Sequence, residues 1–133
     1  MEIRFSGRTA VLALVVFLTS LSSAKAGIGD YTFKLIEGIA TQREGAVVIV
    51  RLVDTRTGRN VPDAVIFATR LDMAPEGMAS MTAAVEPVPS AEPGLYKFRT
   101  DLPMEGKWQL SLAAKIQGEL GTLKSKLALK VVP

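Results

Sequence analysis

The sequence predicts an all-β fold, because polar and hydrophobic residues alternate with a period of two along most of the chain. The clearest example is residues 108–116 (WQLSLAAKI), in which Trp108 and every second residue after it are apolar. Such alternation is typical of antiparallel strands with one buried and one solvated face. We therefore expect sheets rather than helices, with Trp108 in the core.

Two further observations support this fold class: the strand-like segments are short, and turn-forming residues separate them. Seven segments qualify: 31–37, 47–53, 64–71, 82–88, 95–100, 108–116 and 122–132. The connections contain Gly, Pro, Asn and Asp, as in DTRTGRNVP and SAEPG, and these residues favour turns.

The first three segments are hydrophobic strands of different kinds. Residues 31–37 (YTFKLIE) alternate, and residues 47–53 (VVIVRLV) are β-branched and nearly continuous. β-Branched residues fit a pleated, half-buried surface. Residues 64–71 (AVIFATRL) place Phe67 and Leu71 on one face.

The last four segments complete the pattern. Pro87 indicates that residues 82–88 form an edge strand, because proline has no N–H with which to donate a hydrogen bond to a neighbouring strand. Residues 95–100 and 108–116 alternate, and residues 122–132 alternate leucine with lysine. The lysines are expected to form a solvated face: Lys124, Lys126 and Lys130. Seven short strands in about 107 residues predict a single immunoglobulin-like antiparallel β-sandwich.

The N-terminal 26 residues have the organisation of a secretory signal peptide. Two arginines precede the apolar run TAVLALVVFLTSL, and an A-x-A sequence ends at Ala26. We predict cleavage after Ala26, export to the periplasm and a mature domain of residues 27–133 that does not insert into a membrane. An uncleaved anchor is the alternative, although the run is short of the roughly 20 apolar residues that a spanning helix needs.

Composition excludes several classes of function. The predicted signal peptide carries three basic residues and one acidic residue, so 13 basic and 12 acidic residues remain in 27–133. No basic cluster is evident along the sequence, and nucleic-acid binding is not expected. Without cysteine or histidine, the chain has neither the usual zinc ligands nor the commonest general base. We predict no catalytic residues and no enzyme.

Methionines gather in one stretch, LDMAPEGMASM (71–81). Met104, in the connection before residues 108–116, is the only other methionine outside the predicted signal peptide. Pro75 and Gly77 interrupt any strand here, although one helical turn over 76–81 could form. We expect all four methionines, Met73, Met78, Met81 and Met104, in loops at one end of the sandwich.

Three interpretations of these methionines compete. Flexible thioether side chains fill irregular gaps in a core, and they also form adaptable docking surfaces. Alternatively, thioethers select soft ions such as Cu(I) and, by the same softness, Ag(I). Asp72 and Glu76, expected in solvated loops, would add a favourable field for a cation. A remote further option is a pocket for a small apolar ligand between the sheets.

The methionine segments also carry a family resemblance. RLDMAPEGMASMTA followed by PGLYKFRTDLPMEGKWQLSL resembles the YtkA-like and FixH-like domains. The likeness covers roughly residues 45–133 and includes two short motifs. These are Pro-Gly-x-Tyr (Pro93, Gly94, Tyr96) and Met-x-Gly-x-Trp (Met104, Gly106, Trp108). It implies a small exported β-sandwich that accompanies copper or heavy-metal efflux, or copper supply to a respiratory oxidase.

The resulting prediction is a periplasmic accessory protein that binds or hands on copper. Its thioether ligands would be Met73, Met78, Met81 and Met104, with Cu(I) as the ion and Ag(I) as a surrogate. The expected partners are metal-efflux or copper-transport membrane components. Because the only hydrophobic segment resembles a cleavable signal, efflux is favoured over the membrane-anchored FixH pattern. The alternative is an interaction module without metal that docks on a transporter or an oxidase assembly system.

Overall fold

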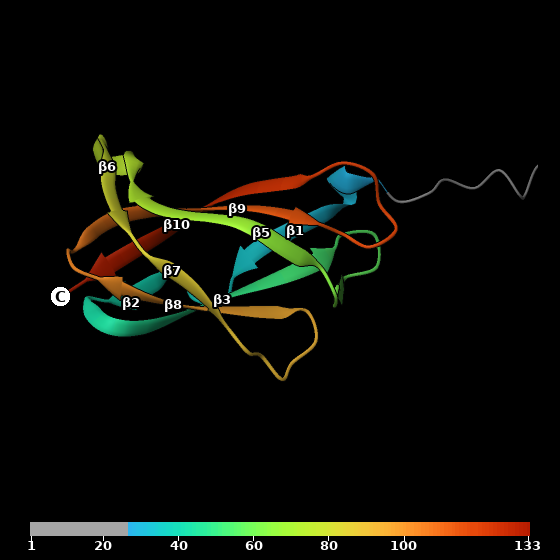
Figure 1. Cartoon of the computed structure of the whole chain (residues 1–133), viewed down its shortest axis with the longest axis horizontal. Helices are drawn as coiled ribbons and strands as arrows, with labels where there is room; N and C mark the ends of the chain where they lie inside the picture. Colours follow the sequence, from blue (N-terminus) through green and yellow to red (C-terminus); the bar gives the residue numbers. More distant parts are fainter. Residues whose placement is uncertain (1–26) are drawn as a thin grey trace, which may run out of the picture.

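In a computed structural model, residues 27–133 are described, and they fold into two packed β-sheets (Figure 1). The predicted signal peptide, residues 1–26, lies outside the described residues. The elements are η1 (Ile28–Asp30), β1 (Tyr31–Leu35), β2 (Ile39–Thr41), β3 (Arg43–Asp54), β4 (Arg59–Asn60), β5 (Val65–Met73), η2 (Ala74–Glu76), β6 (Met78–Ala83), β7 (Val85–Val88), β8 (Leu95–Leu102), β9 (Gly106–Lys115) and β10 (Leu123–Val132). Within this part of the chain, no helix has the length and hydrophobicity needed to cross a bilayer.

The strand order is that of an immunoglobulin-like sandwich. Sheet A has the order β1-β3-β8-β7, with β4 beside β3, and sheet B has the order β2-β10-β9-β5-β6. Neighbouring strands are antiparallel except β2, which runs parallel to β10. The chain crosses several times between the two sheets, and the strand orders correspond to the arrangement of ABED against GFC. The predicted fold class is confirmed.

The structure differs from the prediction by three additional strands and one parallel pair. β2 and β4 contain three and two residues, which is too short for alternation to be recognised. β6 begins inside the methionine stretch, at Met78, four residues before the strand predicted over 82–88. Pro87 does lie in an edge strand, β7, as predicted.

The core lies between the two sheets and is filled by alternate strand residues. Its largest fully buried side chains include Trp108, Phe33, Leu52, Leu71 and Met73. The expectation that Phe67 shares a buried face with Leu71 is wrong. The register between β5 and β9 shifts between Ile66 and Ala68, and this irregularity leaves Phe67 55% exposed.

Candidate functional site at the methionine end

The hairpin from β5 to β6 forms one end of the sandwich, at the left of Figure 1. A single 3-10 turn, η2, carries Pro75 and ends at Gly77. Gly77 has φ of 76° and its N–H donates to the Ala74 carbonyl at 2.9 Å. Glycine adopts this left-handed conformation without a steric penalty. The helical turn therefore lies at Ala74–Glu76 rather than over 76–81, where the chain is extended.

The four methionines are not all in loops, as was expected; only Met104 is. Met73 ends β5 and is 1% exposed, whereas its cross-strand partner Met78 begins β6 and is 40% exposed. Ala83 lies opposite the buried Leu71, so alternation along β6 places Met81 on the inner face, where it packs against the core. We name this region, containing Met73, Met78, Met81 and Met104, the methionine end.

Met73 joins the hairpin to the connection that contains Met104. A Cβ built on Gly106 would lie 2.7 Å from the Met73 Cε methyl group, so that methyl packs directly over Gly106. Nearby, the Glu76 carboxylate accepts a hydrogen bond from the Lys107 N–H at 2.9 Å. These contacts confirm that the two methionine segments, far apart in sequence, lie at the same end of the sandwich.

Trp108 holds the connection from the inside. Its side chain is completely buried, and its indole N–H donates to the Met104 carbonyl at 2.9 Å. The Met104 side chain is 37% exposed. The Met-x-Gly-x-Trp motif thus has a structural reading: tryptophan fixes the methionine backbone, and glycine leaves room for Met73.

Asp72 is buried, contrary to the expectation of a solvated loop carboxylate. It is 4% exposed and accepts hydrogen bonds from the Ala74 N–H at 2.9 Å and from the Arg70 Nε at 2.7 Å. Arg70 also donates to the Ala79 carbonyl at 2.7 Å, across the hairpin. The backbone hydrogen bond from Ala74 and the Arg70 guanidinium hold the pKa of Asp72 below its ordinary value.

One of the two carboxylates near the sulfurs is neutralised within the protein. Arg70 pairs with Asp72, which therefore does not supply the free cation-attracting field that was predicted. Glu76 accepts a hydrogen bond from a neutral backbone N–H and keeps its negative charge. Among residues 27–133, no group of three or more carboxylates is arranged to hold a metal ion. The donors that the methionine end offers are thioether sulfurs, of which those of Met78 and Met104 belong to partly exposed side chains.

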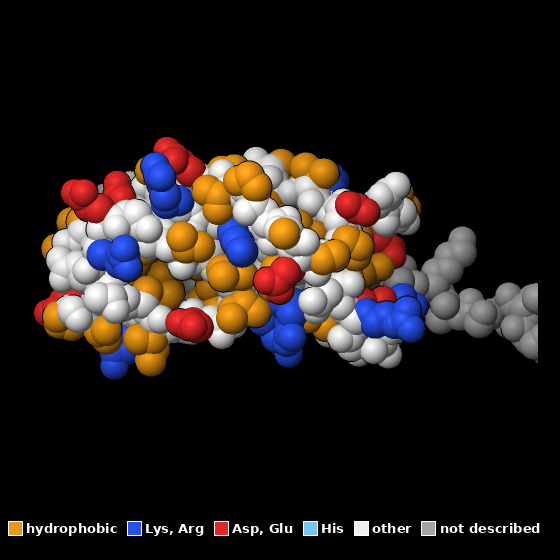
Figure 2. Space-filling model, turned by 90° about the horizontal axis from the view of Figure 1, so that it is seen from below, with side chains coloured by type: hydrophobic (Ala, Val, Ile, Leu, Met, Phe, Trp, Pro, Cys, Tyr) orange, Lys and Arg blue, Asp and Glu red, His pale blue; other side chains and the backbone are white. Residues whose placement is uncertain are grey.

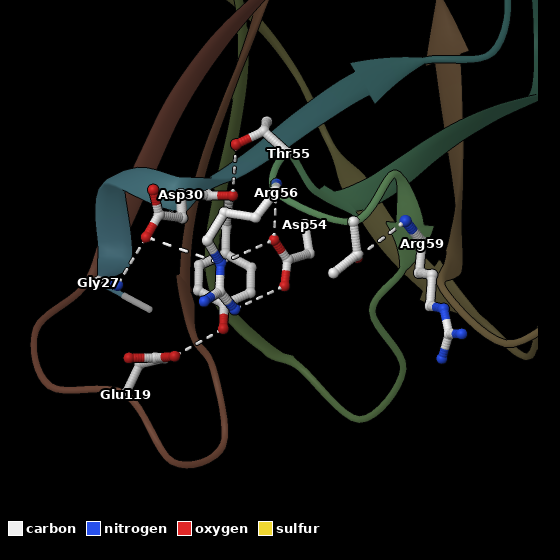
Figure 3. Close-up of polar contacts among 9 residues, drawn as sticks. Gly27, Asp30, Asp54, Thr55, Arg56, Arg59 and Glu119 are labelled. Carbon is white, nitrogen blue, oxygen red and sulfur yellow. Dashed lines mark hydrogen bonds and ion pairs between the residues drawn. The ribbon is translucent and has the colours of Figure 1, made fainter. Parts of the chain in front are cut away.

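A polar cluster, the polar end, occupies the opposite end of the sandwich (Figure 3). The Tyr31 hydroxyl donates to Glu119 at 2.6 Å, and the Arg56 Nη2 lies 3.0 Å from the Asp54 carboxylate. Asp30 accepts the Gly27 N–H at 2.9 Å. The hydrogen bond to Glu119 raises the pKa of Tyr31 to about 12, and the Arg56 guanidinium lowers that of Asp54.

Sequence reasoning missed the polar end. Glu119 belongs to the turn QGELG, 88 residues after Tyr31, and no local spacing links them. The pairing follows only from the packing of β1 beside the turn between β9 and β10.

A groove between the sheets bears on the remote apolar-ligand interpretation. Its volume is about 630 Å³, and Ile66, Tyr96 and Phe98 are among the residues that line it. It lies by the start of β8, whereas Met104 follows the end of that strand. An apolar ligand in this groove stays a prediction.

Comparison with known families matches residues 25–113 to the YtkA-like family. The chain belongs to the YtkA-like family. The match covers more than half of the chain and includes both methionine segments, and it starts earlier than the resemblance over 45–133 suggested. The FixH-like part of that resemblance stays a prediction.

No curated protein matches the chain, but solved structures do. The filamin domain of Lin-41 is 18% identical, with a TM-score of 0.48 and coverage of 84% of this chain and 98% of that one. The ZirS C-terminal domain is 11% identical, with a TM-score of 0.48 and coverage of 84% and 71%. Domains 4 and 5 of the S-layer protein SbsC are 17% identical, with a TM-score of 0.42 and coverage of 77% and 51%.

Proposed function

We propose that this YtkA-like domain is an exported periplasmic accessory protein that binds Cu(I), or a similar soft ion, at its methionine end and hands it on. The ion is the cargo, and the protein is not an enzyme. In this proposal the protein takes part in heavy-metal efflux, as membership of the family suggests. The partners that receive the ion from it are membrane components of efflux systems.

One observation supports this proposal above the others: the Met73 methyl group packs over Gly106, the first residue of β9, two residues after Met104. Because Met73 is also the cross-strand partner of Met78, it links two partly exposed thioethers from different parts of the chain. Sulfur ligands of this kind suit Cu(I) and Ag(I) better than Zn or Mg.

The four methionines would contribute unequally. Met78 and Met104 present their side chains to solvent and are the primary ligands in this proposal. Met73, fully buried behind them, would support the site and supply a third sulfur. Met81 packs inward against the core, so its main contribution is to packing.

The electrostatics favour release as well as binding. Asp72 is already paired with Arg70 within the protein, so a bound cation gains little from it, whereas the charge of Glu76 would attract the ion toward this end. The ligands themselves are neutral thioethers, which hold an ion less tightly than anionic ligands do, and this is suited to transfer.

Titration with Ag(I) or Cu(I) tests the proposal. The Met78→Leu/Met104→Leu double variant should bind about tenfold or more weakly, which corresponds to at least about 1.4 kcal/mol. Met81→Leu is the matched control and should change affinity less than the double variant. Leucine conserves volume, and such swaps usually cost under about 1.5 kcal/mol of stability. Wild-type affinity in a variant with all four methionines replaced would disprove the ligand assignment.

A second candidate is an interaction module without metal. The exposure of Met78 and Met104, 40% and 37%, favours it, because adaptable thioether surfaces also dock proteins. The partner would be a membrane transporter or a respiratory-oxidase assembly system. The test is capture of such a partner by the purified protein in the presence of a Cu(I) chelator. Capture by wild type that fails with the Met78→Leu/Met104→Leu variant would support docking over metal transfer.

A further inference from the structure

The outer face of sheet B brings Lys107 of β9 beside the lysines of β10, which the sequence already placed on one solvated face. Lys107 in β9 and three residues of β10 share this face, and all four are exposed: Lys107, Lys124, Lys126 and Lys130. None of them forms an ion pair with an acidic side chain among residues 27–133. A fifth lysine, Lys115, donates to the Gly121 carbonyl at 3.1 Å.

Two of these lysines lie directly opposite each other. Lys107 and Lys130 are cross-strand partners in the β9–β10 ladder. Like charges in directly opposed positions destabilise a sheet. In the five strands of sheet B the only acidic residue is Asp72, which pairs with Arg70 and lies close enough to Lys126 to interact with its charge. The repulsion between Lys107 and Lys130 therefore has no neutralising acid within the sheet.

Two of the β10 lysines, Lys124 and Lys126, border a shallow trough, and Arg70 of β5 lines it from the other side. Its volume is about 410 Å³, and Ala68, Ser111 and Ala113 contribute to its floor. The register places Ala113 between Ala68 and Lys124. It likewise places Ser111 between Arg70 and Lys126. Small side chains on β9 and Ala68 thus form a low floor beside Lys124 and Lys126, with Arg70 on the opposite side.

The outer face of sheet A is different. There Arg99 has an acidic neighbour, Glu86, at 3.8 Å, and the cross-strand partner of Arg99 is Val47, which is 56% exposed. Figure 2, which views the molecule from the side of β8 and β3, shows hydrophobic side chains in the middle with basic and acidic ones scattered among them. The outer face of sheet A also carries Lys34 and Lys97, but acidic side chains (Glu86 and Asp101) share that face, so the larger excess of positive charge lies on sheet B.

We propose that the trough on sheet B binds an extended, acidic segment of a partner protein, lying along β9. Alternate residues of a strand are about 6.6–6.8 Å apart, which is the spacing of Lys124 and Lys126. Acidic side chains at alternate positions of an extended partner have the same spacing. The small floor lets the partner backbone approach, and a recessed channel suits a peptide better than a planar layer of lipid headgroups.

This inference is independent of metal binding at the methionine end. Binding is tested with an acetylated peptide of alternating glutamate and alanine, with the glutamine–alanine peptide as its neutral counterpart. The variant is Lys124→Gln/Lys126→Gln/Lys130→Gln. The matched control, Lys34→Gln/Lys97→Gln/Arg99→Gln, removes three charges from the outer face of sheet A. Circular dichroism and thermal unfolding establish that each variant is folded.

We expect the acidic peptide to bind wild type, and to bind the sheet B variant about tenfold more weakly, with under about a twofold change in the control. Affinity should fall as salt increases, because exposed charge pairs are screened. Ala113→Leu, which fills the trough without changing charge, should weaken binding as well. Equal losses in both triple variants would overturn the proposal. So would lysine-dependent binding to phosphatidylglycerol vesicles without binding to the peptide.

Discussion

The two ends of the sandwich differ in how their side chains are used. At the polar end, ionic and hydroxyl groups pair with one another: Tyr31 with Glu119 and Arg56 with Asp54. At the methionine end, the backbone is fixed from the core by Trp108 and Met73, while Met78 and Met104 remain partly exposed. At the polar end the charged and hydroxyl groups are paired with one another. At the methionine end the thioether side chains of Met78 and Met104 stay accessible on a backbone that the core holds in place.

This difference indicates where a ligand site can form. A site needs donors held in place by other residues. Trp108 and Gly106 hold the Met104 segment from below. Within the hairpin, Arg70 donates to the Ala79 carbonyl and Asp72 accepts from the Ala74 N–H. The predictions that follow compare the two ends, beginning with the largest expected effect.

Replacing Trp108 with alanine should have the largest effect. The side chain is fully buried, and truncating a buried aromatic residue typically costs about 3–5 kcal/mol. Trp108→Phe should cost less, and it isolates the loss of the hydrogen bond to the Met104 carbonyl. Urea unfolding measures both. A loss from Trp108→Ala below about 1 kcal/mol would contradict the view that the methionine end is anchored in the core.

Gly106→Ala should be the next most damaging change. The φ angle of 133° strains any residue with a side chain, and the new Cβ would lie 2.7 Å from the Met73 Cε. We expect a loss of about 1–3 kcal/mol, together with weaker Ag(I) binding. Gly118→Ala, in the turn near the polar end, is the control. It also has positive φ, 87°, but nothing lies within 4 Å of its Cβ. An equal loss of stability in the two variants would show that the Met73–Gly106 contact contributes nothing beyond backbone strain.

Asp72→Asn should destabilise the protein by about 1–2 kcal/mol, because an amide cannot accept both hydrogen bonds that the carboxylate accepts. The pKa of Asp72 is lowered in the folded protein. Its stabilising contribution is therefore complete above pH 3.8, the ordinary value, and is lost as pH falls through the folded pKa. The difference between wild type and variant should shrink in acid, in thermal melts from pH 7 to 2. The exposed Glu92→Gln, which also removes one negative charge, serves as the control for the effect of net charge on stability.

The smallest effect is expected at the polar end, for Tyr31→Phe, at about 0.5–1 kcal/mol. In a Tyr96→Phe background, ultraviolet titration should give a pKa of about 12 for Tyr31. The folded pKa is raised, so this contribution is present below pH 10, the ordinary value, and is lost as pH rises toward 12. Glu119→Gln should move the Tyr31 pKa toward 10. An unchanged pKa in that variant would show that the carboxylate is not the cause.

The period-two pattern was sufficient to predict the sandwich and the burial of Trp108. It was sufficient because one face of each long strand packs on the other sheet, and that requirement is visible in the sequence. The same reasoning failed at β6, where Ala79, Ser80 and Thr82 are small or polar and conceal the alternation. It also failed at Phe67, since a change of register within β5 follows from pairing with β9 and not from local sequence.

The candidate site was predictable only in part. Grouping Met104 with the other methionines depended on two connections lying at one end of the sandwich, which follows from strand order. The burial of Asp72 was not predictable, because Arg70 and the Ala74 N–H reach it only through the geometry of the hairpin. The lysine face of sheet B combines residues of β9 and β10, so no basic cluster is evident in the linear sequence.

X-ray absorption spectroscopy of the protein loaded with Cu(I) tests the central claim most directly, because it identifies the atoms bound to the ion. We predict at least two sulfur neighbours at about 2.3 Å, by analogy with other metal–sulfur bonds, and their loss in Met78→Leu/Met104→Leu. Neighbours that are only oxygen or nitrogen, or a sulfur signal unchanged in the double variant, would contradict the assignment of the methionine end as a soft-metal site.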